Sequence, residues 1–394
     1  MWQTFSFNAP QIRFGMDTID FLGKQVKRLG GKNTLIITGP SVQKTGVLAR
    51  ALALLDEQKI KHNVYIAPRS QVEPTSKDAD TTADVIKNGR FDSVVGIGGG
   101  SVMDTAKLAV ALLDHPGSAR EYFSEKRLLK RSMPMIMIPT TSGTSSEITP
   151  YSVLVDETDG FKKSAVALCL LPDVAIIDPR LTVSVPQAVT ATTGMDAFIH
   201  ALEAYTAKTA NSMCDVLALE SMRIIARWLG PAFADGSNLE ARYQMALGTM
   251  YAGIGLCNVG THIVHSMSEI FSAEENVTHG DSLSAILLAC MESMYVALPE
   301  KVFAIGQALG QPMQGLSLQE GAQVTLNALA DFIESVELPA SLKDLGIKED
   351  AGKIEAWAEA SFRDLQHLNT APRNYSAQNL QKVFQRAFAT CSCC

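Results

Sequence analysis

The chain lacks any long apolar run: no uninterrupted apolar stretch in its 394 residues reaches membrane-spanning length. Its opening segment, MWQTFSFNAPQIRFG, also lacks the basic and then apolar order of a secretory signal peptide. These two absences argue against a membrane partner. They predict a protein that works in the cytoplasm.

Charge is sparse as well. Only 19% of the residues are charged, and 41 acidic residues against 34 basic ones give a net charge of −7. A surface that binds the phosphates of nucleic acid needs a basic excess. The composition therefore argues against nucleic acid as the main partner and favours a globular enzyme or small-molecule binding protein.

Cysteine is scarce, with seven residues in the chain. Four lie scattered in apolar segments and predict buried free thiols in a reducing compartment, namely Cys169, Cys214, Cys257 and Cys290. The other three belong to the closing CSCC, residues 391–394. That group is either a metal-binding or oxidant-reactive site or a frayed tail without a role.

The length of the chain exceeds what one hydrophobic core ordinarily holds, so we expect two domains. In the first part, apolar runs alternate with amphipathic segments such as residues 41–58 and 75–89, which predicts a parallel sheet covered on both faces. The expected buried strands are residues 34–38, 63–67, 93–98, 134–139 and 174–178. From about Pro186 the apolar period is helical. The sequence thus predicts an α/β domain over residues 1–181 and an all-helical domain over residues 182–394.

A glycine cluster follows the third expected strand, in VVGIGGGSVMDTAK. Gly98, Gly99 and Gly100 remove side chains where the backbone comes close to something, and Ser101 is expected at the helix N-cap. Free amides and the helix dipole suit such a turn to an anion, most naturally a pyrophosphate. The alternative is a tight turn that needs glycine only for a positive φ. Asp104, on the first helical turn, suits a ligand hydroxyl or amide, or the helix dipole.

A second polar segment, PTTSGTSSE (residues 139–147), directly follows the fourth expected strand. In an open parallel sheet, ligands bind beyond the carboxyl ends of the strands. Both polar segments leave strands at that edge. We therefore expect the two loops to hold one nucleotide together.

Histidines and one aspartate are grouped in the second half. Three of the seven histidines fall between residues 260 and 280, and TTGMDAFIHALEAY places Asp196 and His200 on one helix face. Alone, that spacing is more often an ion pair or a cap than a metal site. Together, however, four side chains form a set of three nitrogens and one oxygen that suits a divalent first-row metal, namely Asp196, His200, His265 and His279. Such a metal can polarise a substrate carbonyl or alkoxide oxygen.

These motifs carry a family resemblance. The segments GGGSVMDTAK, PTTSGTSSE, VAIIDPRLT, ATTGMDAFIHALEAY and VHSM…THG resemble the iron-dependent group III alcohol dehydrogenases, in one order over residues 5–388. The resemblance implies a Rossmann-like dinucleotide-binding domain and a helical metal-binding domain, an architecture shared with dehydroquinate synthase. It implies Fe²⁺, with Zn²⁺ possible, at the four ligands just named. It also implies dinucleotide contacts at Gly99, Gly100, Ser101, Thr140, Thr141, Thr144 and Lys162, with Asp104 beside them.

The chain departs from the family pattern one helical turn after the third ligand. Members often carry a histidine there that is regarded as a proton relay, and this chain has Glu269. That carboxylate can relay protons if burial raises its pKa, join the metal shell, or hydrogen-bond the cofactor ribose. His265 and Glu269 are therefore our catalytic candidates. His262 is expected beside the site or in the core, not as a ligand.

A second departure concerns the choice of cofactor. Members that prefer NAD often end the first of these strands with an aspartate that binds the adenosine ribose and repels a 2′-phosphate. Here Gly39 stands at that place, followed by Ser41 and Lys44. Without the carboxylate a 2′-phosphate is not repelled, and Ser41 can donate to it. We predict that NAD(P) is used and that NADP(H) is preferred.

The resemblance implies hydride transfer between nicotinamide and a small primary alcohol or its aldehyde, in a homodimer or larger homo-oligomer. Tyr151 and Leu256 are the expected walls of the substrate pocket, or else plain core residues. Two alternatives are a dehydroquinate synthase-like lyase, whose polyanionic substrate would need a basic cluster near the ligands, and a non-catalytic assembly protein of the same fold. The four ligands argue against the metal-free maleylacetate-type reductases.

Overall fold

The computed structural model describes residues 4–67, 73–123 and 126–389. The chain divides into two compact units, one of which is Asn8–Val185. The other joins Pro186–Cys394 to the N-terminal segment Met1–Phe7. The domain boundary between residues 181 and 182 stays a prediction.

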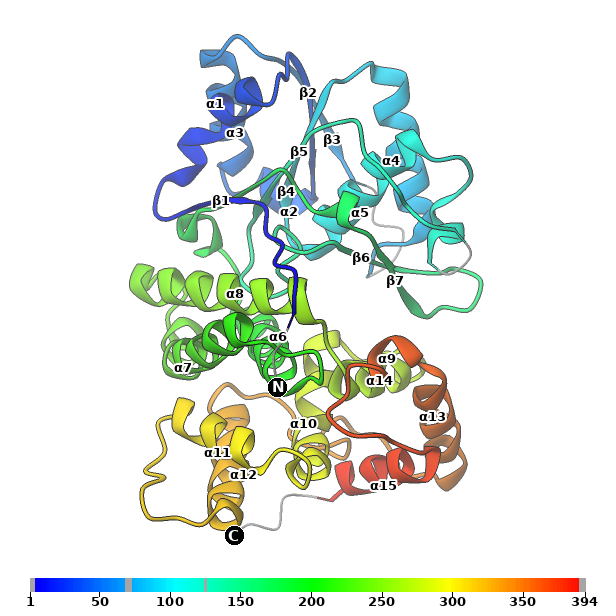
Figure 1. The fold of residues 1–394 in the computed structure, drawn as a ribbon. Coiled ribbons are helices and arrows are strands. Elements are labelled where there is room, and N and C mark those ends of the chain that lie inside the picture. The colour runs from blue at the N-terminus through cyan, green and yellow to red at the C-terminus, as the bar shows by residue number, and fades with distance from the viewer. Residues whose placement is uncertain (1–3, 68–72, 124–125, 390–394) are drawn as a thin grey trace. The chain divides into compact units, whose positions relative to one another are not determined.

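The first unit alternates strands and helices (Figure 1). Its strands are β1 (Gln11–Phe14), β2 (Asn33–Thr38), β3 (Lys61–Ile66), β4 (Ser93–Gly98), β5 (Met135–Pro139), β6 (Tyr151–Val155), β7 (Lys162–Val166) and β8 (Val174–Ile177). Its helices are α1 (Leu22–Arg28), α2 (Pro40–Gln43), α3 (Val47–Glu57), α4 (Ser76–Gly89) and α5 (Gly100–Ala111).

Six strands form one parallel sheet in the order β1-β8-β5-β4-β2-β3, and β6 and β7 form a separate antiparallel hairpin. Successive residues of a strand point to opposite faces, so Ile36 packs in one core while Leu35 and Ile37 pack in the other. Helices α1 and α3 cover the first face, and α4 and α5 cover the second (Figure 1). The predicted α/β fold with a parallel sheet covered on both faces is confirmed.

The sheet reverses its order between β2 and β4. The chain runs from β2 outward to β3 and then returns to the other side of β2 as β4, which makes a switch point of the kind where α/β proteins bind ligands. β4 and β5 end side by side, with Gly98 opposite Pro139, and the Thr140 N–H donates to the Gly98 carbonyl at 2.9 Å. The glycine turn (residues 98–101) and the threonine loop (residues 139–147) therefore begin next to each other, beside the end of β2.

Two local expectations for this unit are wrong. The strand at 63–67 was expected to be buried, but β3 lies at the sheet edge and is largely exposed, because only β2 pairs with it. The helix expected over 41–58 is broken into α2 and α3, because Gly46 adopts a φ of 77° that a continuous helix does not allow.

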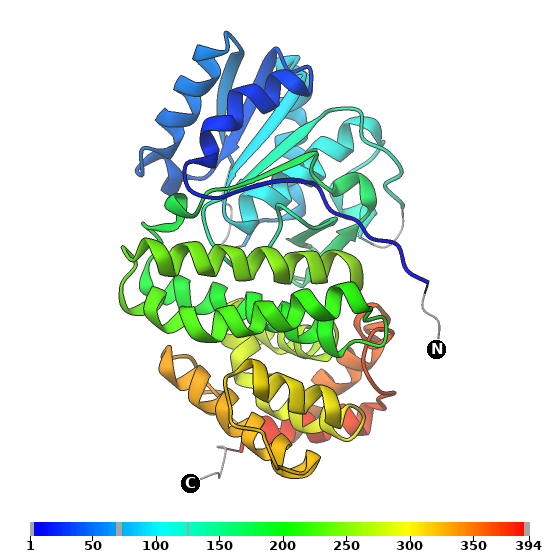
Figure 2. The same cartoon turned by 60° about the vertical axis from the view of Figure 1, so that its left-hand side comes forward.

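The second unit is helical, as predicted. Its helices are α6 (Gln187–Thr206), α7 (Ser212–Ala234), α8 (Leu239–Val259), α9 (Ile263–Glu275), α10 (His279–Tyr295), α11 (Pro299–Ala308), α12 (Leu318–Ser335), α13 (Ala351–Arg363), α14 (Leu365–Leu368) and α15 (Ala377–Ala387). The long helices α6, α7 and α8 pack on one another (Figure 2). Most of the helices contribute to one large apolar core.

Among the described residues, no helix is both long enough and apolar enough to cross a membrane. The predicted free thiols Cys214, Cys257 and Cys290 are buried. Cys169 is free but only half-buried, because it lies in a short surface turn beside the exposed Leu168, so its predicted burial is wrong. The CSCC group lies outside the described residues, and the cytoplasmic location stays a prediction.

Candidate metal centre and dinucleotide loops

Three helices of the second unit carry the four predicted metal ligands. Asp196 and His200 lie one turn apart on α6, His265 lies in the first turn of α9, and His279 is the first residue of α10. Gly280 allows α10 to rest on α6, because a β-carbon there would fall 2.5 Å from the Thr192 Cβ. That close approach brings His279 to Asp196.

The three histidines converge on one carboxylate oxygen. Their Nε2 atoms lie 3.3 Å (His200), 3.5 Å (His265) and 3.7 Å (His279) from Asp196 Oδ1. Ligand atoms held tetrahedrally about 2.1 Å from one ion lie about 3.4 Å from one another. Asp196 Oδ1 and His265 Nε2 are buried and have no hydrogen-bond partner among the described residues. Asp196, His265 and His279, whose ligand atoms all lie within 4.8 Å of one another, therefore fit a divalent cation, and His200 Nε2 approaches the same carboxylate oxygen.

Electrostatics favours the ionised form of the aspartate. Burial by itself raises the pKa of Asp196, but His200, His265 and His279 together hold that pKa well below its usual range. Asp196, His200 and His265 are almost fully buried, whereas 25% of the His279 side chain is exposed. The cluster is thus an anionic oxygen among imidazoles, exposed mainly at His279.

The glycine turn has a different geometry from the one expected. Helix α5 begins at Gly100 with Gly99 as its N-cap, so Ser101 lies inside the first turn and its predicted capping role is wrong. The cap position needs an extended backbone, which Gly99 adopts. None of Gly98, Gly99 and Gly100 has a positive φ, so the positive-φ explanation is also wrong.

Close approach explains these glycines instead. A β-carbon on Gly100 would fall 2.7 Å from Thr144 Cγ2, and one on Gly98 would fall 2.8 Å from Val102 Cβ. At Gly99 the nearest atom, Thr141 Oγ1, would be at 3.6 Å, an ordinary contact. Gly100 therefore lets the two polar loops meet.

Asp104 and Lys107, both on α5, hold the threonine loop through hydrogen bonds to Ser146. Asp104 Oδ1 accepts from the Ser146 hydroxyl at 2.6 Å, and its Oδ2 accepts from the Val153 N–H at 3.3 Å. The Lys107 ammonium, fully buried, donates to the Ser146 carbonyl at 2.8 Å. Contact of Asp104 with a dinucleotide stays a prediction, because its carboxylate is engaged within the protein.

The other predicted cofactor residues lie at the same sheet edge or on the hairpin. Gly39 follows the end of β2 as the N-cap of α2, and Ser41 and Lys44 after it are exposed. Thr140, Thr141 and Thr144 are half-buried in the loop after β5. Lys162, at the start of β7, forms an ion pair with Glu73 at 2.9 Å.

Both units match models of one family. Residues 9–179 match the model described as iron-containing alcohol dehydrogenase, and residues 190–388 match the C-terminal model of the Fe-containing alcohol dehydrogenase family. The chain belongs to the iron-containing alcohol dehydrogenase family. It is therefore an enzyme, an oxidoreductase that acts on alcohols, and neither the lyase nor the assembly alternative is favoured.

Relatives in this family align along nearly the whole chain. The long-chain-alcohol dehydrogenase 1 of Geobacillus thermodenitrificans is 36% identical over 385 residues, covering 96% of this chain and 95% of its own. A 1,3-propanediol dehydrogenase of Klebsiella pneumoniae is 32% identical and covers 98% and 100%. The crystal structure of a 1,3-propanediol oxidoreductase superposes with a TM-score of 0.92 at 31% identity, covering 98% of this chain and 100% of that one.

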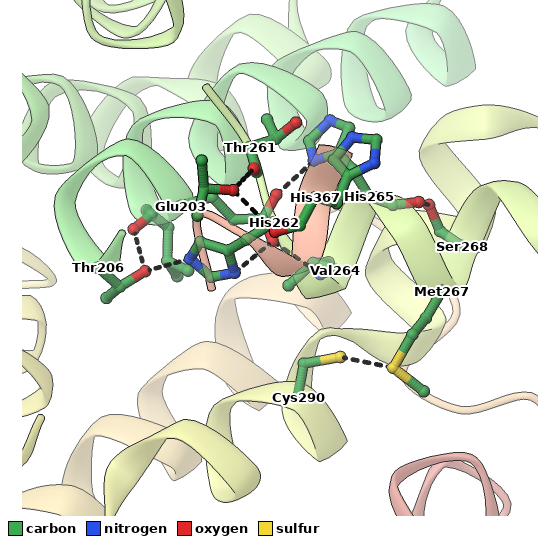
Figure 3. A network of polar contacts seen from close by, with 12 residues as sticks. Glu203, Thr206, Thr261, His262, Val264, His265, Met267, Ser268, Cys290 and His367 are labelled. Atoms are coloured by element: carbon green, nitrogen blue, oxygen red, sulfur yellow. Dashed lines mark hydrogen bonds and ion pairs between the residues drawn. The ribbon is translucent and has the colours of Figure 1, made fainter. Parts of the chain in front are cut away.

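One residue of this alcohol dehydrogenase was missed by the sequence argument. Glu203, fully buried on α6, accepts from His265 Nδ1 at 2.6 Å and from the Val264 N–H at 2.7 Å (Figure 3). Its position seven residues after Asp196, on the same helix face, was the available signal. His262 is fully buried beside it, with Nδ1 2.9 Å from Glu203 Oε1, as expected of a residue near the site.

The remaining predicted residues belong to different elements. Glu269 lies half-buried on α9. Burial lowers the pKa of the nearby, half-buried His367, but its hydrogen bond to Asp364 and the charges of Asp364 and Glu269 raise that pKa overall. Leu256 is buried on α8, in the helical unit, and Tyr151 is half-buried in the α/β unit. The catalytic role of Glu269 and the pocket roles of Leu256 and Tyr151 stay predictions.

Proposed function

We propose that this enzyme transfers hydride reversibly between a small primary alcohol, or its aldehyde, and C4 of a nicotinamide dinucleotide. Iron(II) is held by Asp196, His200, His265 and His279 in this proposal. The observation that carries it is the convergence of three imidazole nitrogens on Asp196 Oδ1. When bound, the cation supplies a Lewis acid for the substrate oxygen.

The loops of the first unit bind and orient the dinucleotide. The amides of Gly100 and Ser101, which begin α5, have no acceptor within the helix and are available to a pyrophosphate, whereas the Val102 N–H already donates to the Gly99 carbonyl. Thr140, Thr141 and Thr144 add hydroxyl groups from the neighbouring loop. Asp104 and Lys107 keep that loop in place through Ser146.

A proton must leave the alcohol hydroxyl when hydride leaves its carbon. Glu269 is half-buried and lies one helical turn after His265 on α9. Its charge interacts with that of His367, which is hydrogen-bonded in turn to Asp364. We assign the Glu269 carboxylate as the acceptor of that proton.

The preferred cofactor in this proposal is NADP(H). No acidic side chain stands at the end of β2, where Gly39 is followed by the exposed Ser41 and Lys44. A 2′-phosphate therefore meets a hydroxyl and an ammonium instead of a carboxylate. We also propose a homodimer or larger homo-oligomer as the working form.

An aldehyde panel under anaerobic conditions tests the proposal. The metal content of the purified protein is measured first, and oxidation of NADPH and NADH is then followed at 340 nm with straight-chain aldehydes. We expect turnover that disappears after chelation, returns with Fe²⁺ and is faster with NADPH. Turnover that survives complete metal removal would contradict the assigned metal centre.

A further inference from the structure

The Glu203 carboxylate sits behind His265, on the side away from the ligand cluster. Its Oε2 lies 2.6 Å from His265 Nδ1, while His265 Nε2 lies 3.5 Å from Asp196 Oδ1. A carboxylate can only accept a hydrogen bond, so the proton of the neutral ring is on Nδ1. The lone pair is then on Nε2, the atom that faces Asp196, which is what a metal ligand requires.

The same carboxylate also caps a helix. His262 is the N-cap residue of α9 but makes no side-chain cap hydrogen bond. The Val264 N–H, one of the first-turn amides that have no acceptor within α9, donates instead to Glu203 Oε1 at 2.7 Å. An anion at a helix N-terminus is favoured by the helix dipole. A side chain of α6 thus fixes the start of α9, and with it the backbone that carries His265.

A second histidine packs against Glu203 without a hydrogen bond from its Nδ1. His262 Nδ1 lies 2.9 Å from Glu203 Oε1, and the other ring nitrogen, Nε2, is 2.8 Å from Thr206 Oγ1 (Figure 3). The Thr206 hydroxyl in turn donates to the Leu202 carbonyl at 2.7 Å, on the same helix as Glu203. Glu203, His262 and Thr206 are all fully buried, so this arrangement has no freedom to rotate into solvent.

We propose that Glu203 is a positioning residue for His265: it keeps His265 protonated on Nδ1, directs Nε2 toward Asp196 and anchors α9, while the buried His262 packs beside it. The proposal rests on the metal centre proposed above. It explains why His262 stands so near the ligands without being one of them.

Substitution E203Q tests this role, because an amide of the same size presents an N–H₂ to one of the two donors, His265 Nδ1 and the Val264 N–H. Its –NH₂ facing His265 Nδ1 would move the ring proton to Nε2, and its –NH₂ facing Val264 would remove the cap. Loss of a partner that orients a metal ligand lowers metal affinity about 10- to 100-fold. We expect that loss for E203Q in chelator competition with Zn²⁺ and Fe²⁺, and none for E220Q, the same change on the surface of α7.

The protonation state of His265 gives a readout independent of turnover. In zinc-loaded wild-type protein with ¹⁵N-labelled histidine, we expect the His265 proton on Nδ1, and a changed or exchange-broadened Nδ1–H in E203Q. A purely structural residue would lower the melting temperature of E203Q and leave both the metal affinity of the folded protein and this resonance unchanged. That result would overturn the proposal.

Two further comparisons keep the test decisive. If E203Q does not fold, E203D replaces it: the shorter carboxylate keeps the charge, and we expect weaker zinc binding, whereas wild-type affinity in E203D would refute the proposal. A wild-type protein that binds no metal at all would overturn the proposed metal centre itself. That failure is distinct from equal metal binding by wild-type and E203Q, which overturns only the role of Glu203.

Discussion

Gly100 and Thr144 stand so close that a β-carbon on residue 100 would fall 2.7 Å from the threonine Cγ2 and Oγ1. The relationship joins the glycine turn after β4 to the threonine loop after β5. Neither loop can move away without the other losing its neighbour. The dinucleotide site proposed above therefore depends on this contact.

The substitution G100A should separate the two loops. Overpacking of this kind costs about 1–3 kcal/mol, so we expect the KM for the dinucleotide to rise about 10- to 100-fold. Metal content should stay that of the wild type, because the four ligands belong to the other unit. G230A is the matched control, since a β-carbon on Gly230 meets nothing within 4 Å. An unchanged KM in G100A would show that the loops are not part of the dinucleotide site.

Removal of Asp196 should abolish metal binding and spare the dinucleotide. All three histidine Nε2 atoms lie within 3.7 Å of its Oδ1, so D196A takes away the common neighbour of the cluster. We expect metal content near zero, loss of turnover by at least about 100-fold, and unchanged binding of NADPH by fluorescence. The surface variant D331N serves as the control. Retention of iron in D196A would exclude Asp196 as a ligand.

The residue after β2 should decide between the two cofactors. A β-carbon on Gly39 would lie 3.3 Å from Val102 Cγ2, a tight contact that a small side-chain shift relieves. G39D places a negative charge where a 2′-phosphate is expected, so the ratio of kcat/KM for NADPH over NADH should fall about tenfold or more. G39N has the same shape without the charge and should change the ratio far less. Equal ratios in the two variants would disprove the electrostatic explanation.

Glu147 should make the stability of the protein depend on pH. Burial raises the pKa of this carboxyl to about 7. A raised folded-state pKa means that the contribution to stability is fully present below the ordinary value of about 4.5 and is lost as the pH rises through 7. E147Q resembles the protonated acid at every pH. Relative to the wild type, it should be nearly neutral at pH 4.5 and more stable by roughly 3 kcal/mol at pH 8. Urea midpoints at both values measure this, and parallel curves for the two proteins would contradict it.

Sequence patterns predicted the helices and strands whose apolar residues recur at a clear spacing. They did not predict features that depend on tertiary contacts, such as which strand lies at the sheet edge. The apolar run of β2 and the helical spacing of apolar residues in α6 can be recognised in the sequence, because buried residues must alternate or recur at helical spacing. The exposure of β3 is not, since its run of apolar residues resembles that of a central strand. Edge position depends on which strands pair.

The candidate site shows the same division. The spacing of Asp196 and His200 predicts that they share one helix face, but the roles of Gly280 and Glu203 cannot be predicted in this way. Gly280 matters because α10 touches Thr192, and Glu203 matters because α9 begins beside it. Both facts are relations between helices that are far apart in the chain. A single sequence does not show which helices pack against each other, so these two relations cannot be predicted from it.

The grouping of the first residues with the helical unit has a consequence for synthesis. Residues 4–7 precede the sheet-bearing segment in the chain, yet they are grouped with the helical unit, which is synthesised after that segment. The sheet-bearing segment Asn8–Val185 has its own core and can fold as soon as it is free of the exit tunnel. Residues 4–7 therefore meet their neighbours only after the helical unit has been synthesised.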